Sequence, residues 1–251
     1  MNTIHATAVI GPGVVLGEGN VIGPHAVLIG PLVVGDDNWF GPGVVLGGPP
    51  EVRGFEHTAG WDEPGPGAGV RIGHRNVFRE HALVNQGWKR ETTIGSSALV
   101  MNKGYIAHDC ELADGVTLAS SVSLGGHVRV GAGANLGLGA QVHQRRIIGP
   151  GAMVGMGTAV TRDVPPYAKV YGVPGRIHGV NVVPLQRTGA SDDAVAWLRA
   201  RYGPGFGTDP DAEVPNPATE APGRSTEAPD LDTVPVDLRM AFIWWAGARA
   251  G

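Results

Sequence analysis

The chain has 251 residues, of which 42% are hydrophobic and 17% are charged, and its formal net charge is −4. This length suffices for one domain with a sizeable core, and the small negative charge without a visible basic stripe argues against a nucleic-acid-binding protein. The single cysteine, Cys110, excludes an internal disulfide framework, and no apolar run approaches the roughly 20 residues of a membrane span, so we expect a cytoplasmic protein without a membrane span or signal peptide.

Branched or apolar residues recur at every sixth position over most of the chain. Three runs carry this spacing, Ile4 to Leu46, Ile72 to Val84 and Ile94 to Val160, and glycine often follows the recurring residue. Each hexad can supply a short strand and a turn with one side chain pointing inward, and three hexads complete one triangular coil. The period therefore predicts an all-β parallel β-helix over residues 1–185, in which residues i and i+18 stack in neighbouring coils.

Two segments interrupt the period. Residues 50–69 are rich in glycine, proline and acidic side chains, and residues 85–91 form a shorter interruption. Long loops in compact folds are commonly functional, although a tolerated insertion is the alternative interpretation.

The sequence beyond the repeats predicts a short helical extension. We expect a short helix over 186–203, an acidic, proline-rich linker over 204–236 and a C-terminal helix over 237–251. Leu238, Phe242 and Trp245 share one face of this last helix. Because its basic flank is thin, that face is expected to dock on protein rather than on a membrane.

The 18-residue coil gathers polar side chains on one strip of the prism. One column contains His108, Gly126 and Gln144, the adjacent column contains Asp109 and His127, and His143 lies beside them. A histidine oriented by a carboxylate can accept a proton from an attacking hydroxyl or amine, and a glycine N–H can stabilise an oxyanion. This set, which lacks a nucleophilic side chain, suits direct acyl transfer from a thioester.

A zinc site is the alternative for these histidines, since trimeric β-helices can bind zinc between subunits. The γ-class carbonic anhydrases would require two histidines five residues apart, and His108, His127 and His143 have no such partner. We therefore expect neither a metal nor a cofactor.

Several motifs in this order resemble the family of UDP-N-acetylglucosamine O-acyltransferases, which catalyse the first step of lipid A synthesis. The motifs are IAHDC from Ile106, LGGHV from Leu124, VHQ from Val142, IIG from Ile147, RDVPPY from Arg162 and GVN from Gly179. The resemblance covers residues 1–200. It implies a left-handed β-helix that forms a homotrimer with active sites between subunits, and an acyl chain on acyl carrier protein as the donor.

The resemblance also implies roles for individual residues. His108 matches the general base, Asp109 its supporting carboxylate and Gly126 the oxyanion donor. The residues that match the substrate-binding positions are His127, His143 and Gln144 in the cleft and Asn181 and Arg187 near the donor and nucleotide.

Four positions differ from the family pattern or tune it. Tyr105 and Asn85 stand where the family has histidines near the acceptor, and Val183 replaces a glutamate. Such changes in hydrogen bonding can alter acceptor choice. Met156 occupies the position that sets acyl length in the family, and its bulk predicts a short to medium chain, with ordinary core packing as the alternative.

The leading hypothesis is an acyltransferase that moves an acyl group from an acyl carrier protein thioester to a hydroxyl or amine of a UDP-N-acetylglucosamine-like or other polar acceptor. A coenzyme-A-dependent O- or N-acetyltransferase is the second hypothesis. A non-catalytic trimeric binding scaffold is the third.

Overall fold

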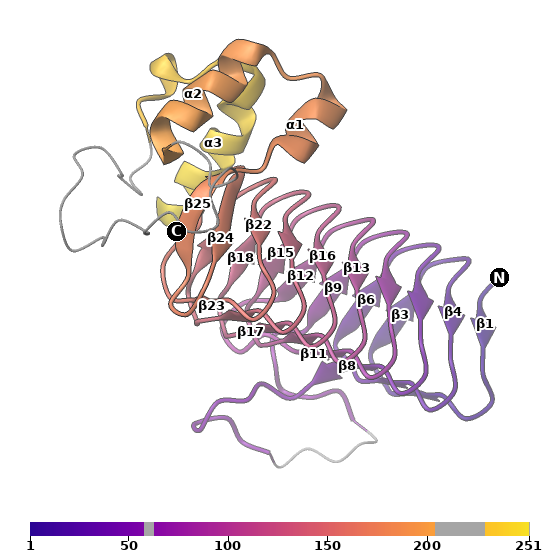
Figure 1. The fold of residues 1–251 in the computed structure, drawn as a ribbon. Helices are drawn as coiled ribbons and strands as arrows, with labels where there is room; N and C mark the ends of the chain where they lie inside the picture. The colour runs from indigo at the N-terminus through magenta and orange to yellow at the C-terminus, as the bar shows by residue number, and fades with distance from the viewer. Residues whose placement is uncertain (58–62, 204–228, 251) are drawn as a thin grey trace.

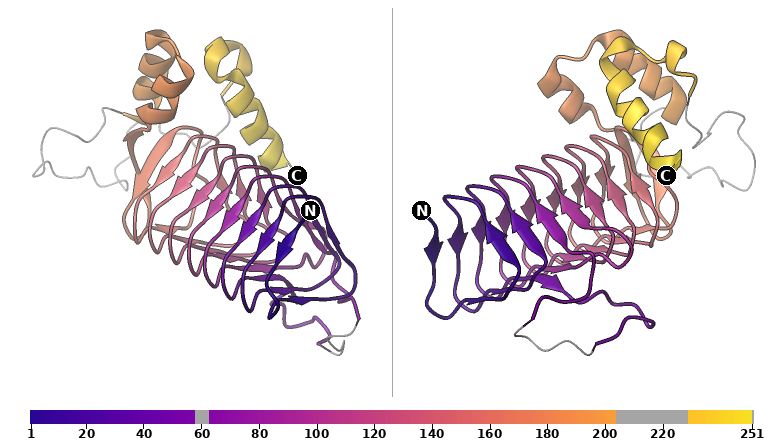
Figure 2. Two further views of the ribbon diagram at one scale, coloured as in Figure 1. Left: turned by 90° about the vertical axis from the view of Figure 1, so that its right-hand side faces the viewer. Right: turned by 180° about the vertical axis from the view of Figure 1, so that it is seen from behind.

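The computed structural model describes residues 1–57, 63–203 and 229–250. The repeats form a parallel β-solenoid of about nine coils, in which each coil contributes one short strand to each of three sheets (Figure 1). This confirms the predicted parallel β-helix. The helices gather at the end of the stack opposite the N-terminus (Figure 2).

The three sheets differ in length, and the longest carries the last two strands of the solenoid. The first contains β1 (Thr3–Ile4), β4 (Val21–Ile22), β7 (Trp39–Phe40), β10 (Val77–Phe78), β13 (Leu99–Val100), β16 (Thr117–Leu118), β19 (Asn135–Leu136), β22 (Met153–Val154), β24 (Ala168–Tyr171) and β25 (Arg176–Val180). The second contains β2 (Val9–Ile10), β5 (Val27–Leu28), β8 (Val45–Gly48), β11 (Leu83–Asn85), β14 (Tyr105–Ile106), β17 (Ser123–Leu124), β20 (Gln141–Val142) and β23 (Ala159–Val160). The third contains β3 (Val14–Leu16), β6 (Leu32–Val34), β9 (Val70–Ile72), β12 (Thr92–Ile94), β15 (Glu111–Leu112), β18 (Arg129–Val130) and β21 (Ile147–Ile148). Among these described strands, every neighbouring pair is parallel except β24 with β25.

The strand register has the predicted step of 18 residues wherever the period is unbroken, as in the pairing of Thr3 with Val21. Across residues 50–69 the step becomes 38, since Trp39 pairs with Val77. Across residues 85–91 it becomes 22, since Val77 pairs with Leu99. The stack therefore resumes after both loops. The second interruption remains partly inside it, because Gln86 is fully buried and donates to the carbonyl oxygens of Gly30 and Gly47.

The expectation of one inward side chain in each hexad is wrong, because most hexads bury two. The recurring residue and the residue two positions before it both point inward, as Val44 with Leu46 and Val116 with Leu118 show. Phe40 and Phe78 stack in neighbouring coils with ring centroids 5.4 Å apart. Ile4 and Ile10 differ from the expectation because they remain 45% and 37% exposed. Their coil is the outermost one and has a neighbour on only one side.

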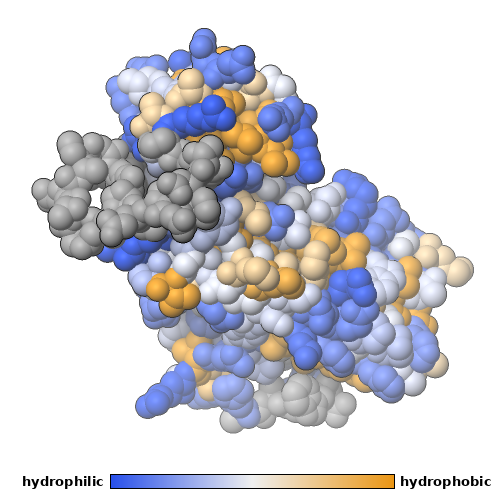
Figure 3. All heavy atoms as spheres, viewed as in Figure 1, coloured by the Kyte–Doolittle hydropathy of each residue, from blue (hydrophilic) through white to orange (hydrophobic). Residues whose placement is uncertain are grey.

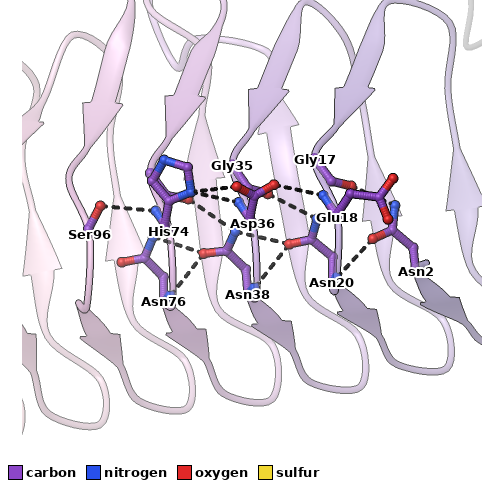
Figure 4. A network of polar contacts seen from close by, with 11 residues as sticks. Asn2, Gly17, Glu18, Asn20, Gly35, Asp36, Asn38, His74, Asn76 and Ser96 are labelled. Carbon is purple, nitrogen blue, oxygen red and sulfur yellow. Dashed lines mark hydrogen bonds and ion pairs between the residues drawn. The ribbon is translucent and has the colours of Figure 1, made fainter.

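A ladder of buried asparagines connects the first coils (Figure 4). Asn38 donates from Nδ2 to Oδ1 of Asn20 and to the carbonyl oxygen of Gly73. Its Oδ1 accepts from the backbone N–H and the side-chain amide of Asn76. Asn20, Asn38 and Asn76 are at most 1% exposed, so each amide relies on its neighbours in the ladder for hydrogen bonds.

Replacement of Asn38 by alanine is expected to lower the free energy of unfolding by about 3 kcal/mol, because it leaves buried polar groups on both neighbours unsatisfied. Chemical denaturation measures the change. Asn135→Ala, at an exposed strand position, serves as the matched control. Equal stability of the two variants would contradict the ladder's importance.

The C-terminal region contains α1 (Val182–Thr188), α2 (Asp192–Tyr202), the 3-10 helix η1 (Leu231–Thr233) and α3 (Val236–Ala250). The expectation of one short helix over 186–203 is wrong, because Gly189 adopts a left-handed conformation (φ 70°) that ends α1, and Ser191 then caps α2. Residues 204–228 of the expected linker lie outside the described residues.

Helix α3 packs on the rest of the protein through Leu238, Phe242 and Trp245, which are all buried. Phe242 contacts the Trp197 ring of α2 edge-on at 5.4 Å. Figure 3 shows apolar residues on the surface of the helices and of the coils among hydrophilic ones. Within the described residues, no helix is both long and apolar enough to cross a membrane.

Candidate active site

The predicted polar strip forms one corner of three successive coils. Asp109, His127 and Arg145 stand 18 residues apart, and each adopts a left-handed backbone conformation with φ near 60°. This conformation costs a non-glycine residue about 1–2 kcal/mol. The chain turns sharply at this corner, and the backbone N–H of His127 donates to the carbonyl oxygen of His108 at 3.0 Å.

His108 and Asp109 form a hydrogen-bonded pair at this corner, with 2.6 Å between Nδ1 and Oδ2. Asp109 is fully buried. Its carboxylate also accepts hydrogen bonds from the backbone N–H groups of Trp88, Lys89 and Arg90 at 3.2, 2.7 and 2.6 Å. The backbone of the loop at 85–91 therefore binds this carboxylate and holds it in place.

The hydrogen bonds keep Asp109 ionised. Burial acts to raise its pKa, but the hydrogen bonds from His108 and from the N–H groups of Arg90, Lys89 and Trp88 outweigh burial and lower the pKa below its usual value. Because an ionised carboxylate only accepts hydrogen bonds, Nδ1 of His108 must donate. A neutral His108 then has an unprotonated Nε2 that can act as a base.

Gly126 lies against the His108 ring. A Cβ atom on Gly126 would be 2.6 Å from both Cε1 and Nε2 of that ring. The Gly126 carbonyl accepts from Arg145 N–H at 2.9 Å, whereas no acceptor for the Gly126 N–H is found in the described part of the chain. The position thus combines space for the imidazole with an N–H available to a developing oxyanion.

His127 completes a compact group with the pair. Its ring centroid is 5.1 Å from that of His108, and its Nε2 is 3.8 Å from Oδ2 of Asp109. The potential ligand atoms of these three residues lie within 4.8 Å of one another, a grouping that the spacing of histidines five residues apart did not predict. The Asp109 oxygens already accept hydrogen bonds from one imidazole and three amides, which suits an oriented base better than a metal ligand.

The acceptor candidates Asn85 and Tyr105 lie side by side, with Asn85 Nδ2 3.5 Å from the Tyr105 hydroxyl. That hydroxyl donates to Glu51 at 2.5 Å. Burial and the Glu51 carboxylate raise the pKa of Tyr105, so the hydroxyl stays protonated. Glu51 was not among the predicted site residues, because only folding brings the loop at 50–69 to this strand.

The remaining predicted residues form no hydrogen bond or ion pair with His108 or Asp109 in the part of the chain that the structure describes. His143 and Gln144 are exposed and contact each other, with His143 Nδ1 3.1 Å from the Gln144 carbonyl oxygen. Asn181 starts α1 and donates to the carbonyl oxygen of Gly151, and Arg187 is exposed in the last turn of α1. Met156 is 71% exposed at a corner of the stack, so it does not pack in the core.

Cys110 follows the pair in sequence but faces the interior. Burial raises its thiol pKa to about 12, and Sγ donates to the Gly125 carbonyl oxygen at 3.3 Å. It is a core residue rather than a nucleophile.

Comparisons of the sequence with known proteins agree with one another. A family model described as UDP-N-acetylglucosamine O-acyltransferase, domain 2, matches residues 163–205. The acyl-[acyl-carrier-protein]–UDP-N-acetylglucosamine O-acyltransferase of Syntrophobacter fumaroxidans is 37% identical over 203 residues, which cover 79% of this chain and 76% of that protein. The protein of the same name in Anaeromyxobacter dehalogenans is 37% identical over 134 residues, so the match spans only about half, 52%, of that relative's length.

Solved structures show the same likeness. The UDP-N-acetylglucosamine acyltransferase from Bacteroides fragilis superimposes with a TM-score of 0.69 at 25% identity, covering 80% of this chain and 81% of that chain. The enzyme from Campylobacter jejuni gives a TM-score of 0.67 at 26% identity with the same coverage. Sequence and fold are thus similar to the same group of proteins.

Proposed function

The chain belongs to the UDP-N-acetylglucosamine O-acyltransferase family, and from this premise we propose that it transfers an acyl group from an acyl carrier protein thioester to a hydroxyl or amine of a UDP-N-acetylglucosamine-like acceptor. The observation that carries the proposal is the 2.6 Å contact between His108 Nδ1 and the buried Asp109 carboxylate, beside the glycine whose N–H is available. Tyr105, Asn85 and Glu51 are the side chains proposed to select the acceptor.

The proposed reaction is direct acyl transfer with His108 as general base. Nε2 of His108 accepts the proton of the acceptor hydroxyl while the hydroxyl oxygen forms a bond to the thioester carbon. The carbonyl oxygen becomes an oxyanion that accepts a hydrogen bond from Gly126 N–H. Collapse of the intermediate breaks the carbon–sulfur bond, and the imidazolium returns the proton to the leaving thiolate. An amine acceptor reacts in the same way.

The test is an assay of the purified chain with UDP-N-acetylglucosamine and acyl carrier protein thioesters from acetyl to long chain, read by mass spectrometry. An acylated sugar nucleotide supports the proposal. Coenzyme A thioesters form a parallel series, and a product from these alone would favour the coenzyme-A-dependent alternative. If neither series yields a product, the proposed donor and acceptor classes are both refuted.

We also propose that the active chain is a homotrimer, by analogy with the family. Exposed apolar side chains on successive coils support this. Leu138 and Met156, 18 residues apart, are 49% and 71% exposed, as expected where an acyl chain or another subunit covers the corner. Sedimentation should give three times the 25.9 kDa mass of one chain. A monomer at assay concentrations would contradict the trimer.

Met156 is proposed to limit acyl length, because its exposed side chain can block an apolar path along the stack. Replacement by glycine should raise kcat/KM for longer acyl chains relative to shorter ones by about tenfold, the effect of a few methylene contacts. Competition between thioesters of different lengths measures the ratio. Met156→Leu retains the bulk and should keep the wild-type preference, whereas an unchanged profile in Met156→Gly would refute this role.

A further inference from the structure

A cationic pocket adjoins the candidate active site on the side of α3. It has a volume of about 540 Å³, and His127, Ile147, Asp163 and Ala248 form part of its wall. Six of its lining side chains are cationic, namely Lys89, Arg90, Arg129, Arg145, Arg146 and Arg249. They come from the loop at 85–91, from successive coils and from α3, which explains why no basic stripe is visible in the sequence.

Among the described residues, two carboxylates form ion pairs with these cations. Asp163 lies 3.4 Å from Arg146 and 3.8 Å from Arg249, and Glu111 lies 3.4 Å from Arg129. Such an excess of positive charge disfavours the folded state unless a counter-charge is bound.

The other three cations, Lys89, Arg90 and Arg145, form no ion pair with a carboxylate of the described residues. Lys89 Nζ lies 3.9 Å above the Trp88 ring. Arg90 donates to the Asp109 carbonyl oxygen at 3.0 and 3.2 Å, which holds its guanidinium in place. Arg145 is exposed and forms no ion pair within the described chain, so its charge is available to a ligand.

The C-terminal helix is part of this pocket. Arg129 donates to the carbonyl oxygen of Ala248 at 2.7 Å, which fixes the end of α3 against β18. Arg249, the next residue, then faces the same cavity. The last turn of α3 therefore forms one wall, and a segment more than 100 residues away in sequence from Arg129 is built into the site.

We propose that this pocket binds a phosphate group of a substrate and that Arg249 makes α3 a functional part of the binding site. Arginine guanidinium groups match phosphate oxygens in geometry and charge, and the volume accommodates a diphosphate. The identity of the ligand rests on the proposed function, which offers two sources: the diphosphate of a nucleotide-linked acceptor and the phosphodiester of the pantetheine arm of the donor.

The electrostatics connect the pocket to the catalytic strip. Burial lowers the pKa of His127, the charges of His108, Arg145 and Arg90 lower it further, and Asp109 opposes them. An anion bound beside Arg145 and Arg90 should therefore raise the pKa of His127. Titration of the imidazole by NMR, with and without inorganic diphosphate, provides a readout that does not depend on turnover.

The main test is calorimetric titration of the full chain with inorganic diphosphate at low ionic strength. Arg145→Ala and Arg249→Ala should each weaken binding about tenfold, as expected for the loss of a charge-assisted hydrogen bond. Arg199→Ala removes an exposed arginine of α2 outside the pocket and should bind as the wild type does. The proposed site is refuted if diphosphate binds weakly and equally to all forms, or if Arg145→Ala binds it as tightly as the control does. Unchanged affinity in Arg249→Ala alone would overturn the role of α3.

Two further titrations identify the source of the phosphate. If the acceptor supplies it, Arg145→Ala weakens binding of UDP, and if the donor supplies it, Arg145→Ala weakens binding of phosphopantetheine. If neither changes, the assignment to a substrate is wrong. His108→Ala should bind diphosphate as the wild type does, so a failure of acyl transfer and a failure of the pocket are distinguishable.

Discussion

Replacement of His108 by alanine is expected to lower the rate of acyl transfer by about 10³-fold, within the range for loss of a general base. The pair with Asp109 leaves Nε2 of His108 free for the acceptor proton, and neighbouring His127 lies 3.8 Å from the same carboxylate oxygen instead of 2.6 Å. His127 is therefore poorly placed to substitute. The rate is measured with the acyl carrier protein thioester that wild type uses best.

The fold of this variant should persist, because the Asp109 carboxylate keeps its three backbone hydrogen bonds. His5→Ala, in the outermost coil and exposed, is the matched control and should retain full activity. If His108→Ala keeps more than a tenth of the wild-type rate with an unchanged melting temperature, His108 is not the base. A scaffold protein would bind its ligand equally well with either variant.

Gly126→Ala is expected to reduce kcat by about 100-fold, since a displacement of the reacting group by about 1 Å has an effect of this size. The added Cβ would lie 2.6 Å from Nε2 and Cε1 of His108, so the imidazole must move. The backbone of Gly126 does not have a positive φ, and alanine adds no conformational strain there. Stability should therefore change less than activity does.

Gly54→Ala provides the control, since a Cβ atom there meets no atom of the described residues within 4 Å. The double variant with His108→Ala separates two roles of Gly126. If the substitution acts by moving the ring, it should have little further effect once the ring is absent. Wild-type kcat in Gly126→Ala would show that the ring position seen here is not the reactive one.

Much of the fold follows from the period of the sequence. An inward residue at every sixth position fixes the strands, and the 18-residue coil then brings Gly126 against His108 and places His127 beside Asp109. The asparagine ladder could also have been predicted from the sequence, since Asn20, Asn38 and Asn76 each stand two residues before a recurring apolar residue. Its signal is a buried polar residue repeated from coil to coil.

Other features could not be predicted, because they depend on where non-repetitive segments return. The loop at 85–91 was visible only as an interruption, yet its backbone N–H groups hold Asp109. Glu51 reaches Tyr105 across 54 residues, and Arg249 reaches the coils from the end of the chain. No periodic pattern encodes contacts of this kind. The single helix expected over 186–203 failed for a local reason, the left-handed Gly189.

The uninterrupted 18-residue step between His108 and Met156 has a consequence for substrate length. Each coil advances the stack by one interstrand spacing of about 4.8 Å. The 48 residues that separate His108 from Met156 therefore correspond to an axial rise of about 13 Å. On the proposed function, the number of coils between base and methionine acts as a ruler for the acyl chain. Deletion or duplication of one 18-residue unit would change the preferred acyl-chain length by a whole coil, whereas substitution of Met156 would change it by a smaller amount.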